Sequence, residues 1–212
     1  RGNAASIASP AAAADRRSAR QALIPVLERE LPMTDAVSWH SRIAADFDAR
    51  YRHAPAFRER LAVWQALIDA HIQPDVRVLD AGCGGGALSQ LVAGRCSSLL
   101  GFDASPEMVA LANARRQQGQ WASHVRFEVG RFGDARIGAP GPYDLILCSS
   151  VLEYLDDLWG ALDWLAGMMS DRATLIFSLP NGISDYRRAE RAVFRVTGRP
   201  RYCALIRHWP DP

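Results

Sequence analysis

The 212-residue chain is 49% hydrophobic and 23% charged, a composition that excludes an intrinsically disordered protein. Its formal net charge of +2 is too small to indicate a nucleic-acid or membrane partner. Uncharged apolar runs stay well short of the roughly 20 residues that a membrane-spanning helix needs, and the four cysteines are irregularly spaced. We therefore expect a reduced, cytoplasmic protein.

The first 32 residues differ in composition from the rest of the chain. They are rich in alanine and arginine and begin with Arg1 rather than methionine. Because the composition changes at Met33, we expect 1–32 to be a flexible or non-native extension and 33–212 to be the folded domain. Between 36 and 73, apolar residues recur at spacings of three and four, which predicts amphipathic lid helices separated at Pro55.

From 74 to 181, five short apolar segments alternate with stretches of helical length. The segments are VRVLDAG (76–82), SLLGFD (98–103), VRFEVG (125–130), DLILCSS (144–150) and TLIFSLP (174–180). Such alternation predicts a Rossmann-like α/β fold with a doubly wound, mostly parallel sheet. Ser105 followed by Pro106 predicts a helix start. One core-facing helical stripe is predicted from Leu155, Trp159, Leu162, Ala166 and Met169.

The segment 76–89 joins a strand to a glycine cluster and then to a helix. Gly82, Gly84 and Gly86 lack a Cβ, which would let the polar end of a ligand approach backbone N–H groups at a helix N-terminus. The glycine spacing also fits the permissive dinucleotide fingerprint. Asp80 distinguishes the two ligands, because a carboxylate there repels a diphosphate and attracts an ammonium group beside a sulfonium.

Asp103 ends the second strand, about 20 residues after the glycines. This is the placement expected of a carboxylate that accepts hydrogen bonds from both ribose hydroxyls. The alternative is a cap for the following helix, but Ser105 already suits that role.

Three motifs in order carry a family resemblance. VLDAGCGGG, GFDASPEM and YDLILCSSVLEYL resemble the successive motifs of class I S-adenosylmethionine-dependent methyltransferases, especially the small-molecule branch with the ubiquinone-type O-methyltransferases. The resemblance covers residues 40–181. It implies transfer of a methyl group from S-adenosylmethionine to a small-molecule or lipid-linked acceptor, with oxygen as the expected attacked atom.

The resemblance also implies a set of cofactor-binding residues near the carboxyl ends of the strands, where open α/β sheets bind ligands. They are Asp80, Gly82, Cys83 and Gly84 for the methionine end, Asp103 for the ribose, Ala104 and Met108 for the adenine, and Cys148 and Ser149 for the floor beneath the donor. Met108 equally fits an ordinary core position of its helix.

Two positions depart from the family pattern. The acid that usually follows the third strand is replaced by Arg131 and Phe132, so the adenine would meet the Phe132 backbone N–H, its ring or the Arg131 stem, or Asp134. The metal-binding E-x-x-E-H pattern of the ubiquinone-type relatives is replaced by residues 150–154, SVLEY. We therefore predict no catalytic metal.

After Asn181 the chain becomes rich in arginine, and the two further strands of the family are expected to be either naturally absent or cut off. The basic segment 182–212 is interpreted either as a solvated helix face or as a cationic rim for an anionic or membrane-presented acceptor. Nucleic acid is disfavoured because the segment lacks a regular aromatic platform. The oligomeric state has no signal in the sequence.

Two residues are candidates for catalysis. Tyr154 follows the expected cofactor floor, and His40 lies in an expected lid helix, so each could position the acceptor or act as a general base. Packing or surface roles are the alternative for both, because neither has an evident partner in the sequence. Two other functions compete with the methyltransferase hypothesis. One is a methyltransferase-like binding subunit without turnover, and the other is an NAD-dependent oxidoreductase, which Asp80 disfavours.

Overall fold

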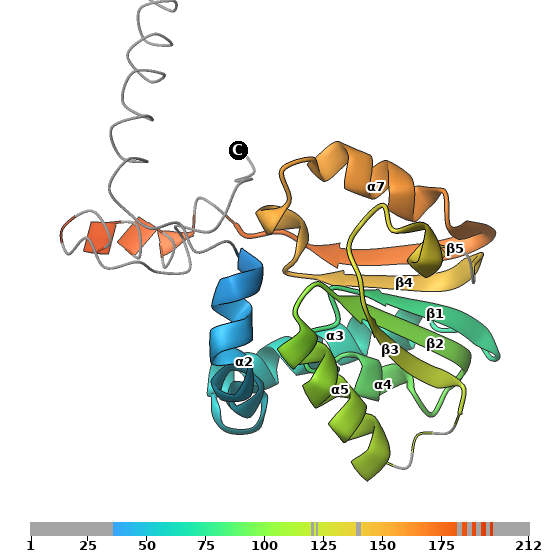
Figure 1. Ribbon diagram of the computed structural model, residues 1–212, viewed down its shortest axis with the longest axis horizontal. Coiled ribbons are helices and arrows are strands. Elements are labelled where there is room, and N and C mark those ends of the chain that lie inside the picture. The colour runs from blue at the N-terminus through green and yellow to red at the C-terminus, as the bar shows by residue number, and fades with distance from the viewer. Residues whose placement is uncertain are drawn as a thin grey trace, which may run out of the picture. The chain divides into compact units, whose positions relative to one another are not determined.

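The computed structural model describes residues 36–119, 121, 123–138 and 141–181, with isolated positions 184, 185, 188, 189, 192, 193 and 196. Its centre is a five-stranded parallel sheet with helices on both faces (Figure 1). The strands are β1 (Val76–Ala81), β2 (Cys96–Asp103), β3 (Val125–Val129), β4 (Tyr143–Ser149) and β5 (Met169–Ser178). The helices are α2 (Ala36–His53), α3 (Pro55–His71), α4 (Ser89–Val92), α5 (Pro106–Gln118), α6 (Ala135–Gly138), η1 (Leu152–Tyr154) and α7 (Leu158–Ala166).

The strand order β3-β2-β1-β4-β5 confirms the doubly wound fold predicted from the sequence. The chain builds outward from β1 through β2 to β3, then crosses back to β4 on the other side of β1. All four strand pairings are parallel. The order reverses between β1 and β4, and in open α/β sheets this switch point is where ligands bind. The predicted extension 1–32 and most of the basic segment lie outside the described residues.

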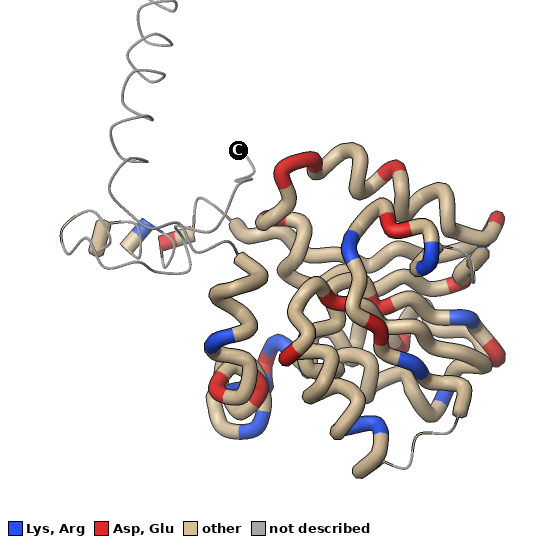
Figure 2. The backbone as a smooth tube through the Cα atoms, in the orientation of Figure 1, with Lys and Arg blue, Asp and Glu red and all other residues tan. Residues whose placement is uncertain are grey.

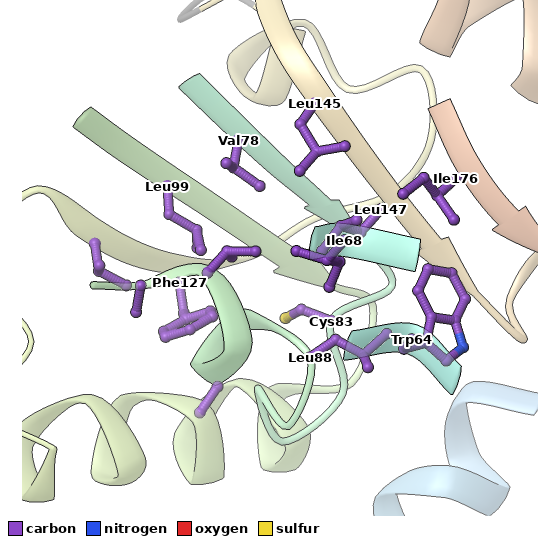
Figure 3. Close-up of a cluster of buried hydrophobic side chains, with 14 of the residues drawn as sticks. Trp64, Ile68, Val78, Cys83, Leu88, Leu99, Phe127, Leu145, Leu147 and Ile176 are labelled. Carbon is purple, nitrogen blue, oxygen red and sulfur yellow. The ribbon is translucent and has the colours of Figure 1, made fainter. Parts of the chain in front are cut away.

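Two hydrophobic layers hold the helices to the sheet. On one face, Trp64 and Ile68 of α3 pack with strand residues such as Val78, Leu99 and Leu145 (Figure 3). On the other face, α7 and η1 cover strand residues that alternate with these in sequence, including Leu79, Leu100 and Ile146. Because the central strands are buried on both faces, their sequences read as continuous apolar runs rather than as alternating ones.

The helix starts agree with the sequence more closely than the predicted stripe does. Pro55 lies in the first turn of α3, and the hydroxyl of Ser105 accepts a hydrogen bond from the Met108 N–H at 3.1 Å, which confirms the cap of α5. The predicted core-facing stripe is wrong at four of its five positions. Leu155 follows η1 and precedes α7, and Ala166 is exposed at the end of α7. Trp159 is 75% exposed on α7, and Met169 belongs to β5 because α7 ends at Ala166.

Candidate functional site

Asp80, at the carboxyl end of β1, is the most deeply buried charged group of the predicted site. Its side chain is 1% exposed, and Oδ2 accepts a hydrogen bond from the Ser89 hydroxyl at 2.5 Å. The other oxygen, Oδ1, is buried and has no hydrogen-bond partner among the described residues. Burial is the main cause that raises the pKa of Asp80 to about 6; the Ser89 hydrogen bond opposes the rise and the nearby charge of Asp103 contributes to it. The carboxylate is therefore desolvated and has one oxygen available for a cationic partner.

Asp103, at the end of β2, holds the glycine loop to the start of α5. Its Oδ2 accepts from the Gly84 N–H and its Oδ1 from the Ser105 N–H, both at 2.9 Å. Burial raises the pKa of Asp103, and these two N–H groups partly offset the effect. Met108 is buried next to this junction, and its sulfur would lie 3.9 Å from a Cβ on Gly84. Ala104 is partly exposed beside it.

The glycine loop forms a tight turn that only glycine adopts readily. Gly82, Gly84 and Gly86 have φ values of +71°, +51° and +77°. A Cβ on Gly82 would lie 2.7 Å from the Val151 side chain, so the loop also packs against the segment after β4. The turn thus brings the first and fourth strand ends into contact.

The N–H groups of this loop are used within the protein, unlike the sequence-based expectation that they face a ligand. Gly82 and Cys83 both donate to the carbonyl of Phe102 at 2.9 Å, and Gly84 donates to Asp103. Gly86 donates to the Cys83 carbonyl at 2.9 Å. The reason is the tightness of the turn, which directs these amides back onto β2 and onto the loop itself. An anion would find no free donor at these four positions.

A cationic side chain from α3 contacts the end of β4, and the sequence did not predict it. Arg60 of α3 donates through Nη2 to the hydroxyl of Ser149 at 2.5 Å and to that of Ser150 at 2.7 Å. Its Nε is buried and has no partner in the described part of the chain. Ser150 adopts a left-handed backbone with φ +53°, which is rare for a serine. Cys148, directly before this pair, is fully buried, and burial raises the pKa of its thiol well above its usual range, so the thiol is unreactive.

The residues after β3 lie on the α7 side of the sheet. The ring of Phe132 packs edge-on against Phe102 at 5.3 Å and against Trp164 at 5.7 Å between ring centroids. Arg131 is exposed. The Phe132 ring is therefore held in a core cluster, and only its remaining exposed part is available to a ligand.

Helix α2 brings the two predicted catalytic candidates together, a pairing that the sequence alone does not indicate. The rings of His40 and Tyr154 meet edge-on, with centroids 5.2 Å apart. The His40 Nδ1 is 2.7 Å from the Ala36 carbonyl, which can only accept, so Nδ1 carries the proton and Nε2 is left as an acceptor. Burial lowers the pKa of His40, while the hydrogen bond to Ala36 and the charge of Asp103 oppose this. His40 is therefore a neutral imidazole near pH 7.

Tyr51, further along α2 than His40, lies near the buried carboxylate of Asp80 on β1. Burial raises the pKa of its hydroxyl, and the charges of Arg60 and Asp80 both act on it. Because His40 is close to Asp103 and Tyr51 is close to Asp80, α2 lies across the carboxyl ends of β1 and β2. This is the lid arrangement expected for the N-terminal helices.

Within residues 36–181, apart from the few gaps, no three His, Cys, Asp or Glu side chains gather in a way that could hold a metal ion. None of the helices in this part is both long and apolar enough to cross a bilayer. The absence of a catalytic metal stays a prediction.

Comparison with known proteins adds independent information. A family model described as a methyltransferase domain matches residues 38–209. The chain is similar to the ubiquinone biosynthesis O-methyltransferase of Xanthomonas campestris pv. campestris (strain B100), with 31% identity over 108 residues, 51% of this chain and 44% of the relative. It is similar to the enzyme of the same name from Thiobacillus denitrificans, with 30% identity over 122 residues, 58% of this chain and 50% of the relative. The chain thus spans about half the length of these curated relatives.

Solved structures show the same fold at low sequence identity. Magnesium protoporphyrin IX methyltransferase from Synechocystis PCC 6803, solved with bound S-adenosylhomocysteine, superposes with a TM-score of 0.56 and 19% identity, covering 87% of this chain and 77% of that one. The N-methyltransferase NodS from Bradyrhizobium japonicum WM9, also solved with S-adenosylhomocysteine, has a TM-score of 0.54 and 23% identity, covering 82% and 84%. The resemblance identified from the three sequence motifs is confirmed.

Proposed function

The chain belongs to the methyltransferase-domain family, and we propose that it binds S-adenosylmethionine and transfers the methyl group to a small-molecule acceptor without a metal ion. The observation that carries this proposal is Asp80 Oδ1, a buried carboxylate oxygen at the switch point of the sheet that has no hydrogen-bond partner among the described residues. A desolvated carboxylate that lacks one partner is a strong acceptor for an ammonium group. A diphosphate would meet its charge with the wrong sign.

The methionine end of the cofactor carries an ammonium and a carboxylate group, which suit a negative and a positive side chain of the protein. Asp80 would accept from the α-ammonium group, and Arg60 would donate to the α-carboxylate through its Nε and its remaining guanidinium protons. The two serine hydroxyls fix Nη2, which orients the guanidinium before any ligand arrives. Gly82, Cys83 and Gly84 would contribute a close approach of the backbone rather than free N–H groups.

The nucleoside end of the cofactor would extend along β2. Each Asp103 oxygen uses one lone pair for a backbone N–H and retains another for a ribose hydroxyl. Ala104 and Met108 would contact the adenine from the start of α5, with Phe132 and the stem of Arg131 on its other edge. Cys148 and Ser149 would form the floor beneath the sulfur.

Methyl transfer requires alignment more than it requires a protein nucleophile. S-adenosylmethionine supplies a methyl group on a sulfonium, which an acceptor atom displaces in line. His40 is the candidate general base for a hydroxyl acceptor, because its Nε2 is an acceptor and its neutral form is favoured. Tyr154 would position the acceptor against that imidazole.

The acceptor class rests on similarity and on charge. The curated relatives are named O-methyltransferases, which supports an oxygen nucleophile. An anionic, lipid-linked or membrane-presented acceptor is supported by the arginines of the segment 182–212, most of which lies outside the described residues. A reduced, cytoplasmic location is part of the same proposal, since Cys83, Cys96 and Cys148 are free thiols.

Titration calorimetry with S-adenosylhomocysteine and with NAD tests the proposal. We expect the protein to bind the first and not the second. Arg60→Gln should weaken S-adenosylhomocysteine binding about tenfold or more, in line with the loss of a charged hydrogen bond. The control Arg58→Gln alters an exposed arginine on the same helix and should leave binding unchanged. Preference for NAD would overturn the proposal.

A panel of hydroxylated acceptors tests turnover separately from binding. Formation of S-adenosylhomocysteine from S-adenosylmethionine with any acceptor supports an enzyme. Cofactor binding without turnover on neutral, anionic and lipid-linked acceptors would favour the binding-subunit alternative instead.

A further inference from the structure

Asp48 is a buried carboxylate on α2 that the proposed chemistry does not use. Its residue is 8% exposed, which is unusual for an acid on a surface helix. Oδ1 accepts from Arg115 Nη2 of α5 at 2.7 Å, and Oδ2 accepts from Arg52 Nη1 at 2.9 Å. The side chains of Asp48 and Arg115 are only 10% and 17% exposed, whereas that of Arg52 is 58% exposed. The pair with α5 is therefore the desolvated one. Figure 2 shows that α2 carries charges of both signs.

Asp48 and Arg115 also contact the glycine loop. Arg115 also donates through Nη1 to the carbonyl of Gly85. A Cβ on Gly85 would lie 2.6 Å from Asp48 Oδ1, so the carboxylate sits directly on the loop backbone. One carboxylate and one guanidinium thus connect α2, α5 and the loop at a single point.

On its other side the loop is held by Asp103, through the Gly84 N–H. The segment Gly84–Gly85 is therefore fixed between Asp103 and Arg115. A second contact joins α2 to the start of α5, because the hydroxyls of Ser41 and Ser105 are 2.8 Å apart. The position of α2 and the conformation of the loop depend on the same contacts.

We propose that Asp48 and Arg115 are positioning residues that couple closure of α2 over the cofactor site to the conformation of the glycine loop. This inference rests on the proposed function, since the coupled site is the one for S-adenosylmethionine. Helix α2 carries His40 and Tyr51, which lie near Asp103 and Asp80. When Asp48 pairs with Arg115, helix α2 and the glycine loop reach their binding geometry together. Cofactor affinity then depends on the fraction of molecules in which the pair is formed.

If the Asp48–Arg115 pair only stabilised the fold, a different result would be expected. Its loss would lower the unfolding temperature, and the affinity of the remaining folded protein for the cofactor product would be unchanged. Affinity and local exchange therefore distinguish the two roles, and thermal stability alone does not.

The test compares Asp48→Asn with Arg52→Gln, which removes the exposed partner of the same carboxylate. We expect Asp48→Asn to raise the Kd for S-adenosylhomocysteine about tenfold, within the usual range for coupling between sites. Arg52→Gln should change the Kd less than about twofold, because exposed ion pairs contribute little. If the single variant does not fold, the double variant Asp48→Asn/Arg115→Gln avoids an unpaired buried charge and is measured instead. An unchanged Kd in the folded variant overturns the proposal.

Hydrogen exchange of the ligand-free protein separates this inference from the proposed function. In Asp48→Asn, amides of 36–53 and of 82–86 should exchange faster together, while those of α7 keep their wild-type protection. This result supports the coupling even if the protein binds no S-adenosylhomocysteine, an outcome that would count against the proposed function alone. Faster exchange in α2 without any change in the loop would overturn the coupling.

Discussion

The charge of Asp80 leads to opposite pH dependences for cofactor affinity and for protein stability. Burial raises the pKa of this carboxyl from its ordinary 3.8 to about 6. If binding needs the ionised form, the apparent Kd for S-adenosylhomocysteine rises by the factor 1 + 10^(pKa − pH), which gives about a tenfold loss of affinity between pH 7 and pH 5. The ammonium group of the ligand keeps its proton throughout this interval.

Stability should move in the other direction. Because the folded-state pKa is above the unfolded-state value, the folded protein binds the extra proton between about pH 6 and pH 3.8. The contribution of Asp80 to the free energy of unfolding therefore increases as the pH falls through this window. A rise from 3.8 to about 6 corresponds to about 3 kcal/mol at 1.36 kcal/mol per pH unit. A loss of affinity at pH 5 is thus not caused by Asp80 destabilising the fold.

Asp80→Asn separates these two effects. At pH 7 the free energy of unfolding of the variant, measured with urea, should exceed that of the wild type by up to about 3 kcal/mol. Calorimetry should show weaker binding of S-adenosylhomocysteine at pH 7 and little remaining pH dependence of the Kd between pH 7 and pH 5. The matched control Asp163→Asn changes an exposed acid of α7 and should alter neither. Wild-type affinity that is flat over this range, or an Asn variant that binds as tightly as the wild type at pH 7, would refute the role of Asp80.

Three further substitutions test the base, the loop and the helix cap. His40→Gln should lower kcat about 100-fold for a hydroxyl acceptor, measured by product formation, and leave the S-adenosylhomocysteine Kd within about twofold. Gly82→Ala should cost at least about 1–3 kcal/mol in urea unfolding, because of its φ of +71° and a neighbouring side chain 2.7 Å from the new Cβ. Gly94→Ala, with nothing within 4 Å, is its control. Ser105→Ala should lower the free energy of unfolding by about 1 kcal/mol, and Ser105→Thr should restore most of it.

The sheet and its two acids were predictable because their causes are local. Continuous apolar runs mark strands buried on both faces, and parallel strands that follow one another end at one edge of the sheet. Asp80 and Asp103 therefore lie near each other, as expected from their places at the ends of β1 and β2. The cap by Ser105 was predictable for the same reason, since its partner is only three residues away.

The charged partners from α2, α3 and α5 could not be predicted in this way. Arg60 contacts Ser149, 89 positions later, and Asp48 contacts Arg115, 67 positions later. Such contacts depend on how helices pack on the finished sheet. One signal was available, because Asp48 lies between Phe47 and Tyr51 on an apolar helix face, where a charge requires a partner.

Selectivity for the cofactor follows from which hydrogen-bonding groups the loop has left. A diphosphate is held in glycine loops mainly by free backbone N–H groups at a helix N-terminus. Here the N–H groups of Gly82, Cys83, Gly84 and Gly86 bond within the protein, and the following helix α4 is one turn long. Among the described residues, two buried groups at the site still lack a partner: Asp80 Oδ1, an acceptor, and Arg60 Nε, a donor on the guanidinium that hydrogen-bonds the end of β4. Glycine spacing alone would admit either ligand, so it is the internal use of the donors and the orphaned carboxylate oxygen that favour a cationic amino-acid end over a diphosphate.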